Sequence, residues 1–130
     1  MQQVEVRIEG LKELDRKLRR LKGRVARKIV RDATRKGAQA LRKEIRAAAP
    51  RRTGFLRRHI RYRTTSRSPT HYTISVGPDR DAFYGRFVEL GTQKMAARPF
   101  MRPAFERARE RIVRIVTDRL REGIERAARG

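Results

Sequence analysis

The segment LKELDRKLRRLKGRVARKIVRDATRKGAQALRKEIRAAA, residues 11 to 49, decides the fold because its apolar residues recur every three or four positions over an unusual length. This spacing predicts a long amphipathic helix that ends before Pro50. A glycine inside a helix costs roughly 1 kcal/mol relative to alanine, so Gly23 marks a place where the helix can divide into two. The apolar positions are Leu11, Leu14, Leu18, Leu21, Val25, Ile29, Ala33, Gly37, Leu41 and Ile45.

Small residues make the second half of this helix thin. They allow another backbone to approach closely, either within the chain's own core or from a second molecule, and we favour ordinary core packing. These residues are Ala33, Gly37, Ala38 and Ala40.

Alternating apolar and polar residues predict strands on both sides of the helix. Residues 4 to 10, VEVRIEG, alternate as a short half-buried strand. In residues 50 to 77 two such runs are separated by the turn sequence SRSPT, residues 66 to 70, which predicts an antiparallel hairpin that ends at Gly77-Pro78. The first run places Leu56, Ile60 and Tyr62 on one face and Arg57, His59, Arg61 and Arg63 on the other, and the second alternates at Tyr72, Ile74 and Val76.

The C-terminal part continues with a polar connection at residues 78 to 83 and a short strand or helical turn at residues 84 to 91. A final helix follows, with Pro103 in its first turn, where a missing N–H is harmless. Its apolar positions are Phe105, Ala108, Ile112, Ile115 or Val116, Leu120 and Ile124. The order of elements predicts a single α+β domain over residues 1–130, with a small antiparallel β-sheet packed against a long N-terminal helix and a C-terminal helix.

Charge is the strongest compositional feature of the chain. Lysine and arginine number 36 against 14 acidic residues, a formal net charge of +22, and charge this uneven predicts a polyanionic partner. The sequence has no cysteine, which excludes disulfides and thiolate metal sites. With no apolar run near 18 residues and no charged-then-apolar leader, we expect a soluble protein made in a cytoplasm, without a membrane partner.

The positive charge is densest in the hairpin, where seven arginines and no acid lie between Arg51 and Arg67. Uncompensated like charges on neighbouring strands are destabilising, so a bound anion is a better explanation than a solvated face. We expect six of these arginines to face DNA or another anionic surface and name them the cationic strip; they are Arg51, Arg52, Arg57, Arg61, Arg63 and Arg67.

Catalytic and metal-binding patterns are not found in the sequence. His59 and His71 are the only histidines, and neither has the cysteines or acidic cluster that a three-ligand metal site needs. Asp79 and Asp81 have the character of turn residues. Glu89 lies among apolar residues, where we expect it to pair with an arginine such as Arg98 or Arg102 rather than to act as a catalytic carboxylate. We therefore expect neither an enzyme nor a cofactor nor a small-molecule substrate.

Residues 87 to 105, FVELGTQKMAARPFMRPAF, crowd apolar side chains between glycine and proline residues, and we name this stretch the apolar clip. Together with APRRTGFLRRHI, residues 49 to 60, it resembles the gene-product-ten-like tail-component family of tailed bacteriophages. In that family a Pro, Thr-Gly and Leu-Arg-Arg run opens the sheet, and a strand with the motif Val-Glu, then an aromatic residue or Leu, then Gly-Thr precedes an Ala-Arg-Pro-Phe-hydrophobic-Arg-Pro-Ala stretch. The matching positions here are Pro50, Thr53, Gly54, Leu56–Arg58, Val88–Thr92 and Ala97–Ala104.

The resemblance implies a virion structural protein of the neck or tail, for tail completion or head-tail joining, made in the host bacterial cytoplasm. It implies a homo-oligomeric ring, for which we expect six copies, around double-stranded genomic DNA that passes through without sequence-specific contacts, and beside neighbouring neck and tail proteins. Such a ring needs a patch that meets a different patch on the next copy. The clip residues that we expect at the subunit interface are Phe87, Glu89, Met95, Arg98, Pro99, Phe100, Met101 and Arg102.

Two alternatives remain open from the residues alone. The clip can simply complete the core of the monomer instead of reaching a neighbour. The charge alone also suits a stand-alone basic nucleic-acid-binding protein of ribosomal or nucleoid type, although that class leaves the clip without a purpose. A toxin-like RNase ranks below both because no catalytic pair is present.

Overall fold

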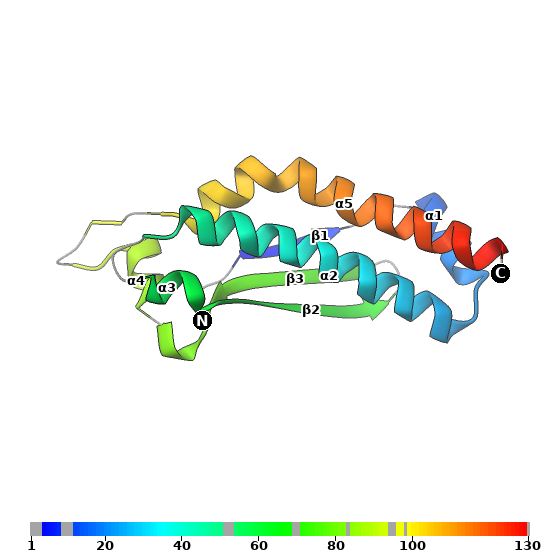
Figure 1. Cartoon of the computed structure of the whole chain (residues 1–130), viewed down its shortest axis with the longest axis horizontal. Coiled ribbons are helices and arrows are strands. Elements are labelled where there is room, and N and C mark those ends of the chain that lie inside the picture. Colours follow the sequence, from blue (N-terminus) through cyan, green and yellow to red (C-terminus); the bar gives the residue numbers. More distant parts are fainter. Residues whose placement is uncertain are drawn as a thin grey trace.

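The computed structural model describes residues 4–8, 12–50, 54–68, 71–82, 84–93, 96–97 and 99–129. Its elements follow the expected order of strand, helices, hairpin and helix (Figure 1). They are β1 (Val4–Ile8), α1 (Lys12–Arg19), α2 (Gly23–Ala48), α3 (Phe55–Arg58), β2 (Ile60–Ser68), β3 (His71–Pro78), the 3₁₀ helix η1 (Arg80–Ala82), α4 (Gly85–Leu90) and α5 (Met101–Arg129).

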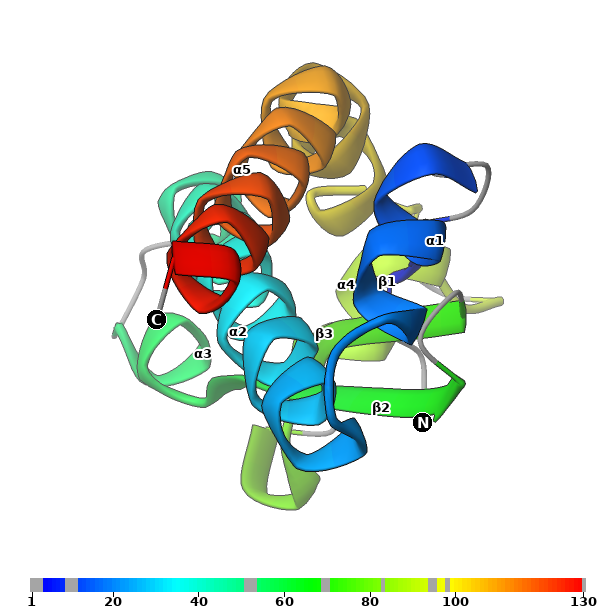
Figure 2. The same cartoon turned by 90° about the vertical axis from the view of Figure 1, so that its right-hand side faces the viewer.

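The three strands form an antiparallel sheet in the order β1-β3-β2, so β3 is central and β2 is an edge strand. The two long helices α2 and α5 lie side by side and cover one face of this sheet, while α1 lies beside the C-terminal half of α5 (Figures 1 and 2). The α+β fold that the sequence predicts is confirmed, including the strand within residues 4 to 10 and the antiparallel hairpin.

The core lies between the helix pair and the sheet. Ile74 and Val76 of β3 and Ile60 of β2 are fully buried there, because the period of two sends these residues to the helix side of the sheet. The helices contribute residues at intervals of three or four: Ala26, Val30, Ala33, Gly37, Leu41 and Ile45 from α2, and Ala104, Ala108, Ile112, Val116, Leu120 and Ile124 from α5.

The long helix predicted from the sequence is divided in two next to Gly23, as expected. Residues 20 to 22 form a turn between α1 and α2, and Gly23 is the first residue of α2. This break shifts the helical phase by one position, so Ala26 and Val30 are buried while the predicted Val25 and Ile29 are only half-buried. The prediction that Val25 and Ile29 continue the apolar face of a single helix was wrong, because a turn does not preserve the 3.6-residue period.

The half of α2 that contains the small residues packs against the protein's own core, as we expected. A Cβ atom on Gly37 would lie 2.5 Å from Cγ2 of Val116 in α5, and 3.3 Å from Cδ1 of Ile74 in β3. Real Cβ atoms do not approach other atoms so closely, so a larger side chain here would force the two helices apart. The small-residue face is therefore covered inside the monomer and is not available to a neighbouring subunit.

Two predicted strand assignments were wrong. Residues 55–58 form the short helix α3 rather than the start of the hairpin strand. Gly54, with φ of 72°, sets the chain into this turn, and Arg58 donates its backbone N–H to the Gly54 carbonyl. Leu56 and Ile60 are both buried although only Ile60 is in a strand, because a spacing of four residues fits both a helix and a strand.

The second wrong assignment concerns the Val-Glu-Leu-Gly-Thr motif, which the resemblance placed in a strand. Its first part lies in the helix α4, so the helical alternative for residues 84 to 91 is the correct one. Gly91, with φ of 76°, ends the helix and donates its N–H to the carbonyl of Phe87. Within the predicted turn at residues 66 to 70, β2 continues to Ser68 with an irregularity between Ser66 and Ser68, and residues 69 and 70 lie outside the described residues.

None of the helices in the described ranges combines the length and the apolarity that a membrane crossing requires.

Candidate functional site

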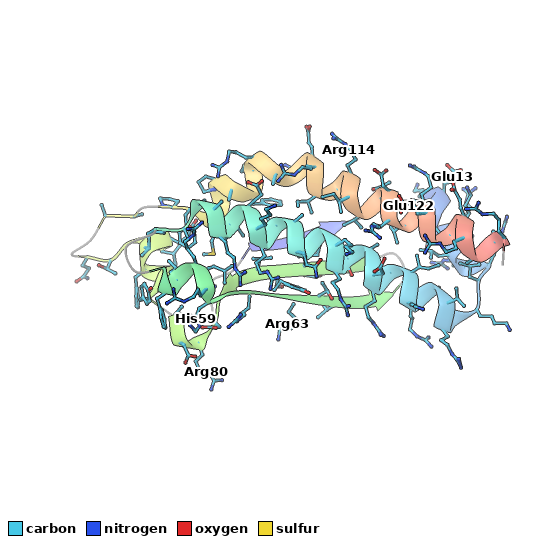
Figure 3. All side chains as sticks on the ribbon, in the orientation of Figure 1. Glu13, His59, Arg63, Arg80, Arg114 and Glu122 are labelled. Carbon is cyan, nitrogen blue, oxygen red and sulfur yellow. The ribbon has the colours of Figure 1, made fainter. Side chains whose placement is uncertain are left out.

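One face of the sheet is not covered by the two long helices, and the cationic strip was expected on it. The side chains of Arg61 and Arg63 are exposed there, and Arg63 points away from the helix layer (Figure 3). Register places Arg63 opposite Ser75 and Arg61 opposite Gly77, so the neighbouring positions on β3 have small side chains. A shallow depression forms along this surface, lined by Arg61, Tyr62, Arg63, Ser75, Gly77, Pro78, Asp79 and Arg80.

Other members of the cationic strip are placed differently. Arg57 lies in α3 and turns back, donating from Nε to the carbonyl oxygen of Arg46 at 2.8 Å. It therefore satisfies a carbonyl at the C-terminal end of α2, and the prediction that it shares a strand face with Arg61 and Arg63 is wrong. Arg51, Arg52 and the side chain of Arg67 lie outside the described residues.

Asp79 joins the two ends of the hairpin. One of its carboxylate oxygens, Oδ2, lies 2.8 Å from His59 Nδ1 and accepts from Arg61 Nε at 3.3 Å. The other, Oδ1, accepts the backbone N–H groups of Asp81 and Ala82, as a turn residue does. Partial burial raises the pKa of Asp79, but the His59 and Ala82 hydrogen bonds, the nearby His59 charge and the Arg61 hydrogen bond outweigh it and hold the pKa below its ordinary value.

The structure also brings His59 beside Asp79 and Asp81, from which it is about twenty residues distant in the sequence. Ligand atoms of His59, Asp79 and Asp81 lie within 4.8 Å of one another. The Asp79 carboxylate is already engaged by an imidazole, a guanidinium and two backbone N–H groups, and the adjacent Arg61 charge opposes a cation. These three residues therefore link the end of β3 and η1 to the start of β2.

Glu89 holds the clip to the last helix. Its side chain is only 8% exposed, and Oε1 accepts the backbone N–H groups of Phe100 at 2.6 Å and Met101 at 2.8 Å, while Oε2 accepts that of Arg102 at 3.3 Å. These are free donors at the start of α5, so the carboxylate satisfies them and also complements the positive end of the helix dipole. No ion pair between Glu89 and a basic side chain is found in the described part of the chain, and the expected partner Arg102 meets Glu89 through its backbone instead.

The rest of the clip is divided between core and surface. Phe100 and Met101 are buried at the start of α5, which agrees with the alternative that the clip completes the monomer core. Pro99 and Arg102 are exposed, Phe87 is half-buried, and Leu90 is 59% exposed, the largest exposure of any described large apolar side chain. Met95 and Arg98 lie outside the described residues.

A second basic surface, along α2, was missed by the sequence analysis. The helix carries nine basic and two acidic residues, and both acids turn toward α5, where Asp32 pairs with Arg119 at 3.8 Å and Glu44 pairs with Arg111. No ion pair of the described residues involves a basic side chain of α2. The sequence does contain this signal, because the basic residues of the segment recur at spacings of four and three. The prediction for this segment used only its apolar positions.

We name this surface the α2 ridge. On a 3.6-residue helix its members share one side, and the intervening position of the repeat is filled by Gln39. Its C-terminal end lies against the edge strand, where the Arg42 guanidinium stands 4.7 Å from the ring centre of Tyr62 and Arg46 Nη2 donates to the Ile60 carbonyl at 3.0 Å. The members are Arg24, Lys28, Arg31, Arg35, Arg42 and Arg46.

Arg46 shows how crowded the positive charge is at this end of the ridge. Its Nε is buried and has no hydrogen-bond partner among the described residues. Burial lowers the pKa of Arg46 from its ordinary value, and the charges of Arg42 and Arg61 lower it further. The C-terminal end of the α2 ridge therefore lies against the start of β2, where Arg46 binds the carbonyl of the residue that precedes Arg61.

The fold and these surfaces define a class of protein. The described residues form a small α+β module with a basic surface along α2 and a carboxylate of α4 bound to backbone N–H groups at the start of α5. The model of the family described as "Bacteriophage HK97-gp10, putative tail-component" matches residues 12–91, more than half of the chain, and the protein belongs to this family of bacteriophage tail components. The match includes the helices α1 and α2, the hairpin and α4, and it ends before the Ala97–Ala104 part of the clip. Neither among curated proteins nor among solved structures is there a match to this chain.

Proposed function

We propose that this tail component is a structural, non-catalytic protein of the neck or tail that completes the tail or joins it to the head. In this proposal it assembles as a ring of about six copies around the DNA channel, the closed arrangement that heterologous interfaces generate. The observation that carries the proposal is the family match over α1, α2, the hairpin and α4, supported by the net charge of +22. Its place would be the virion, after synthesis in the host bacterial cytoplasm, with neighbouring neck and tail proteins as partners.

The exposed part of the clip is the proposed subunit contact. Leu90, Pro99 and Arg102 reach the surface beside the buried Phe100, so they can meet a neighbouring copy without disturbing the core. The thin face of α2 is not the complementary patch, because α5 of the same chain covers it. The half-buried Phe87, together with Met95 and Arg98, is retained in this proposed interface.

The proposed DNA-facing groups are Arg61 and Arg63, with Arg51, Arg52 and Arg67 from the same segment. A channel through which DNA slides needs contacts to phosphates that are independent of sequence, which arginine side chains on an open sheet face can make. Arg57 contributes to this surface only through its link to the end of α2.

Light scattering after size exclusion at high salt tests the ring. The nuclease-treated protein is expected to elute as a discrete oligomer of about six copies, with closed rings in electron micrographs. A Leu90→Asp variant is expected to shift this population toward monomer, whereas Val113→Asp, an exposed apolar residue on α5, is the matched control. A wild-type monomer at every protein concentration, both alone and with purified neck and tail proteins, would contradict the proposal.

A further inference from the structure

We propose that the α2 ridge, together with Arg61 and Arg63, is a docking surface for the phosphate backbone of double-stranded DNA. This inference rests on the proposed function for its biological setting, but its evidence is the arrangement of charge on α2. It assigns the principal contact to a helix rather than to the hairpin strand alone.

No side chain of the ridge forms an ion pair within the described protein, although Asp32, which pairs with Arg119, lies one helical turn from Lys28 and Arg35. The acids of α2 both face α5 and are paired there, and the ridge positions contain only basic residues and Gln39. Four of its members, Arg24, Lys28, Arg31 and Arg35, are exposed. Like charges one helical turn apart are destabilising in an isolated protein, so a row of them favours an external anion.

The length of the ridge matches the helical repeat of duplex DNA. From Arg24 to Arg46 the helix rises about 33 Å at 1.5 Å per residue. This is close to one turn of a DNA duplex, about 34–36 Å, along which the duplex presents one negative charge per roughly 1.7 Å. A straight row of cations of that length can follow a groove edge or lie across neighbouring phosphates without any base contact.

The described part of α2 exposes no large apolar side chain, which favours DNA over an acidic protein surface as the partner. Protein interfaces normally contain aromatic or aliphatic anchors near their centre. The exposed large apolar side chains in the described ranges are Tyr84, Leu90 and Val113, and none of them lies on α2. A surface with guanidinium groups and no apolar anchor suits a partner that is recognised by phosphate charge alone.

The C-terminal end of the ridge is held in place by contacts within the protein itself. Arg46 is fixed by the Ile60 carbonyl, Arg57 by the Arg46 carbonyl, and Arg42 by the Tyr62 ring. The buried, unpartnered Nε of Arg46 beside Arg42 and Arg61 places several guanidinium groups in a small volume. Fixed donors lose less side-chain entropy on binding a phosphate, which strengthens this end of the ridge.

A salt titration with two matched variants tests the inference. The ridge variant is Arg24→Gln, Arg31→Gln and Arg35→Gln in one chain, and the control is Arg107→Gln, Arg109→Gln and Arg114→Gln on the outer surface of α5. Both remove three exposed charges that take part in no described ion pair. The probe is a duplex of random sequence of about three helical turns, and affinity is measured by fluorescence anisotropy over a series of salt concentrations.

The ridge variant is expected to bind DNA about 100-fold more weakly at low salt, and the slope of log K against log salt should become shallower by about 2 to 3 units, at roughly 0.9 for each lost phosphate contact. The control should lose about threefold or less in affinity, because it lowers only the overall charge. Equal losses in both variants would show that net charge alone binds DNA and would overturn the inference. The inference would also be overturned if poly-glutamate, added at the same concentration of charge, displaced the DNA. The ridge would then be assigned to an acidic protein.

Light scattering on the same variants distinguishes a failure of the inference from a failure of the proposed function. If the ridge variant forms the wild-type oligomer but loses DNA affinity, both stand. If the wild-type chain binds DNA through the ridge yet never assembles, the ring proposal fails and the inference stands. If rings form and the ridge variant binds DNA as the wild type does, the inference fails and the ring proposal stands.

Discussion

Along the flank of α2 that faces α5, both acidic residues of the helix meet arginines and the small residue Gly37 lies against Val116. Along the flank beside β2, the same helix presents basic residues with no acidic partner in the described structure. Burial and charge are thus separated on one helix. The first flank stabilises the monomer, whereas the second adds repulsion to the monomer and is explained only by something outside it.

The largest effect is expected where the helix pair is tightest. Gly37→Ala should destabilise the fold by about 2 kcal/mol, since the new Cβ overlaps Val116 Cγ2 and overpacking a core costs about 1–3 kcal/mol. Chemical denaturation measures the change.

Two further variants identify the cause of that loss. Val116→Ala removes the overlapping methyl groups, so the double variant with Gly37→Ala should be more stable than the sum of the single effects predicts. Gly23→Ala, at the first position of α2 near only the flexible Arg27 side chain, should cost little. A Gly37→Ala variant as stable as wild type would mean that the two helices are not closely packed.

The next largest effect is expected at the Glu89 link between α4 and α5. Glu89→Gln should lower the free energy of unfolding by about 1–2 kcal/mol, because the neutral amide offers a weaker acceptor to three backbone N–H groups than the carboxylate does. Glu122→Gln, an exposed position on α5, serves as the control. Equal stability of the two variants in urea would exclude the link as a stabilising contact.

A smaller effect is expected at Asp79, on the sheet side of the molecule. The folded state lowers the pKa of this carboxyl group, so it stabilises the fold above the unfolded-state pKa near 4, and the contribution is lost as the pH falls through the lower folded-state pKa. Asp79→Asn should cost roughly 1 kcal/mol or less at neutral pH, since the group is partly exposed. Thermal unfolding between pH 2 and pH 6 should show a shallower acid dependence for the variant; identical profiles would contradict the assignment.

The smallest effect on stability is expected on the basic flank. Replacing Arg31 and Arg35 by glutamine should change the free energy of unfolding by about 0.5 kcal/mol or less, with a slight gain at low salt as repulsion is relieved. A clear loss of stability at low salt would show that these arginines hold the monomer together, and the two flanks would then not differ as described.

Several features follow from the sequence alone. Period-two and period-3.6 patterns located the hairpin and both long helices, because burial of one face leaves a periodic trace in the residues themselves. The glycine break at Gly23 and the turn character of Asp79 were likewise local properties of the chain. The density of arginine indicated an anionic partner, since net charge does not depend on the fold.

Other features were decided only by the tertiary structure. Leu56 fits a strand and a helix equally well by spacing, and the turn at Gly54 resolved it as helix. The partner of Glu89 was found among backbone N–H groups rather than arginines, because free donors at a helix start become visible only when the helix is placed. The same reason applies to α2: its sequence contains the row of basic residues, but only the packing of α5 on one flank shows which charges are neutralised and which are left to a partner.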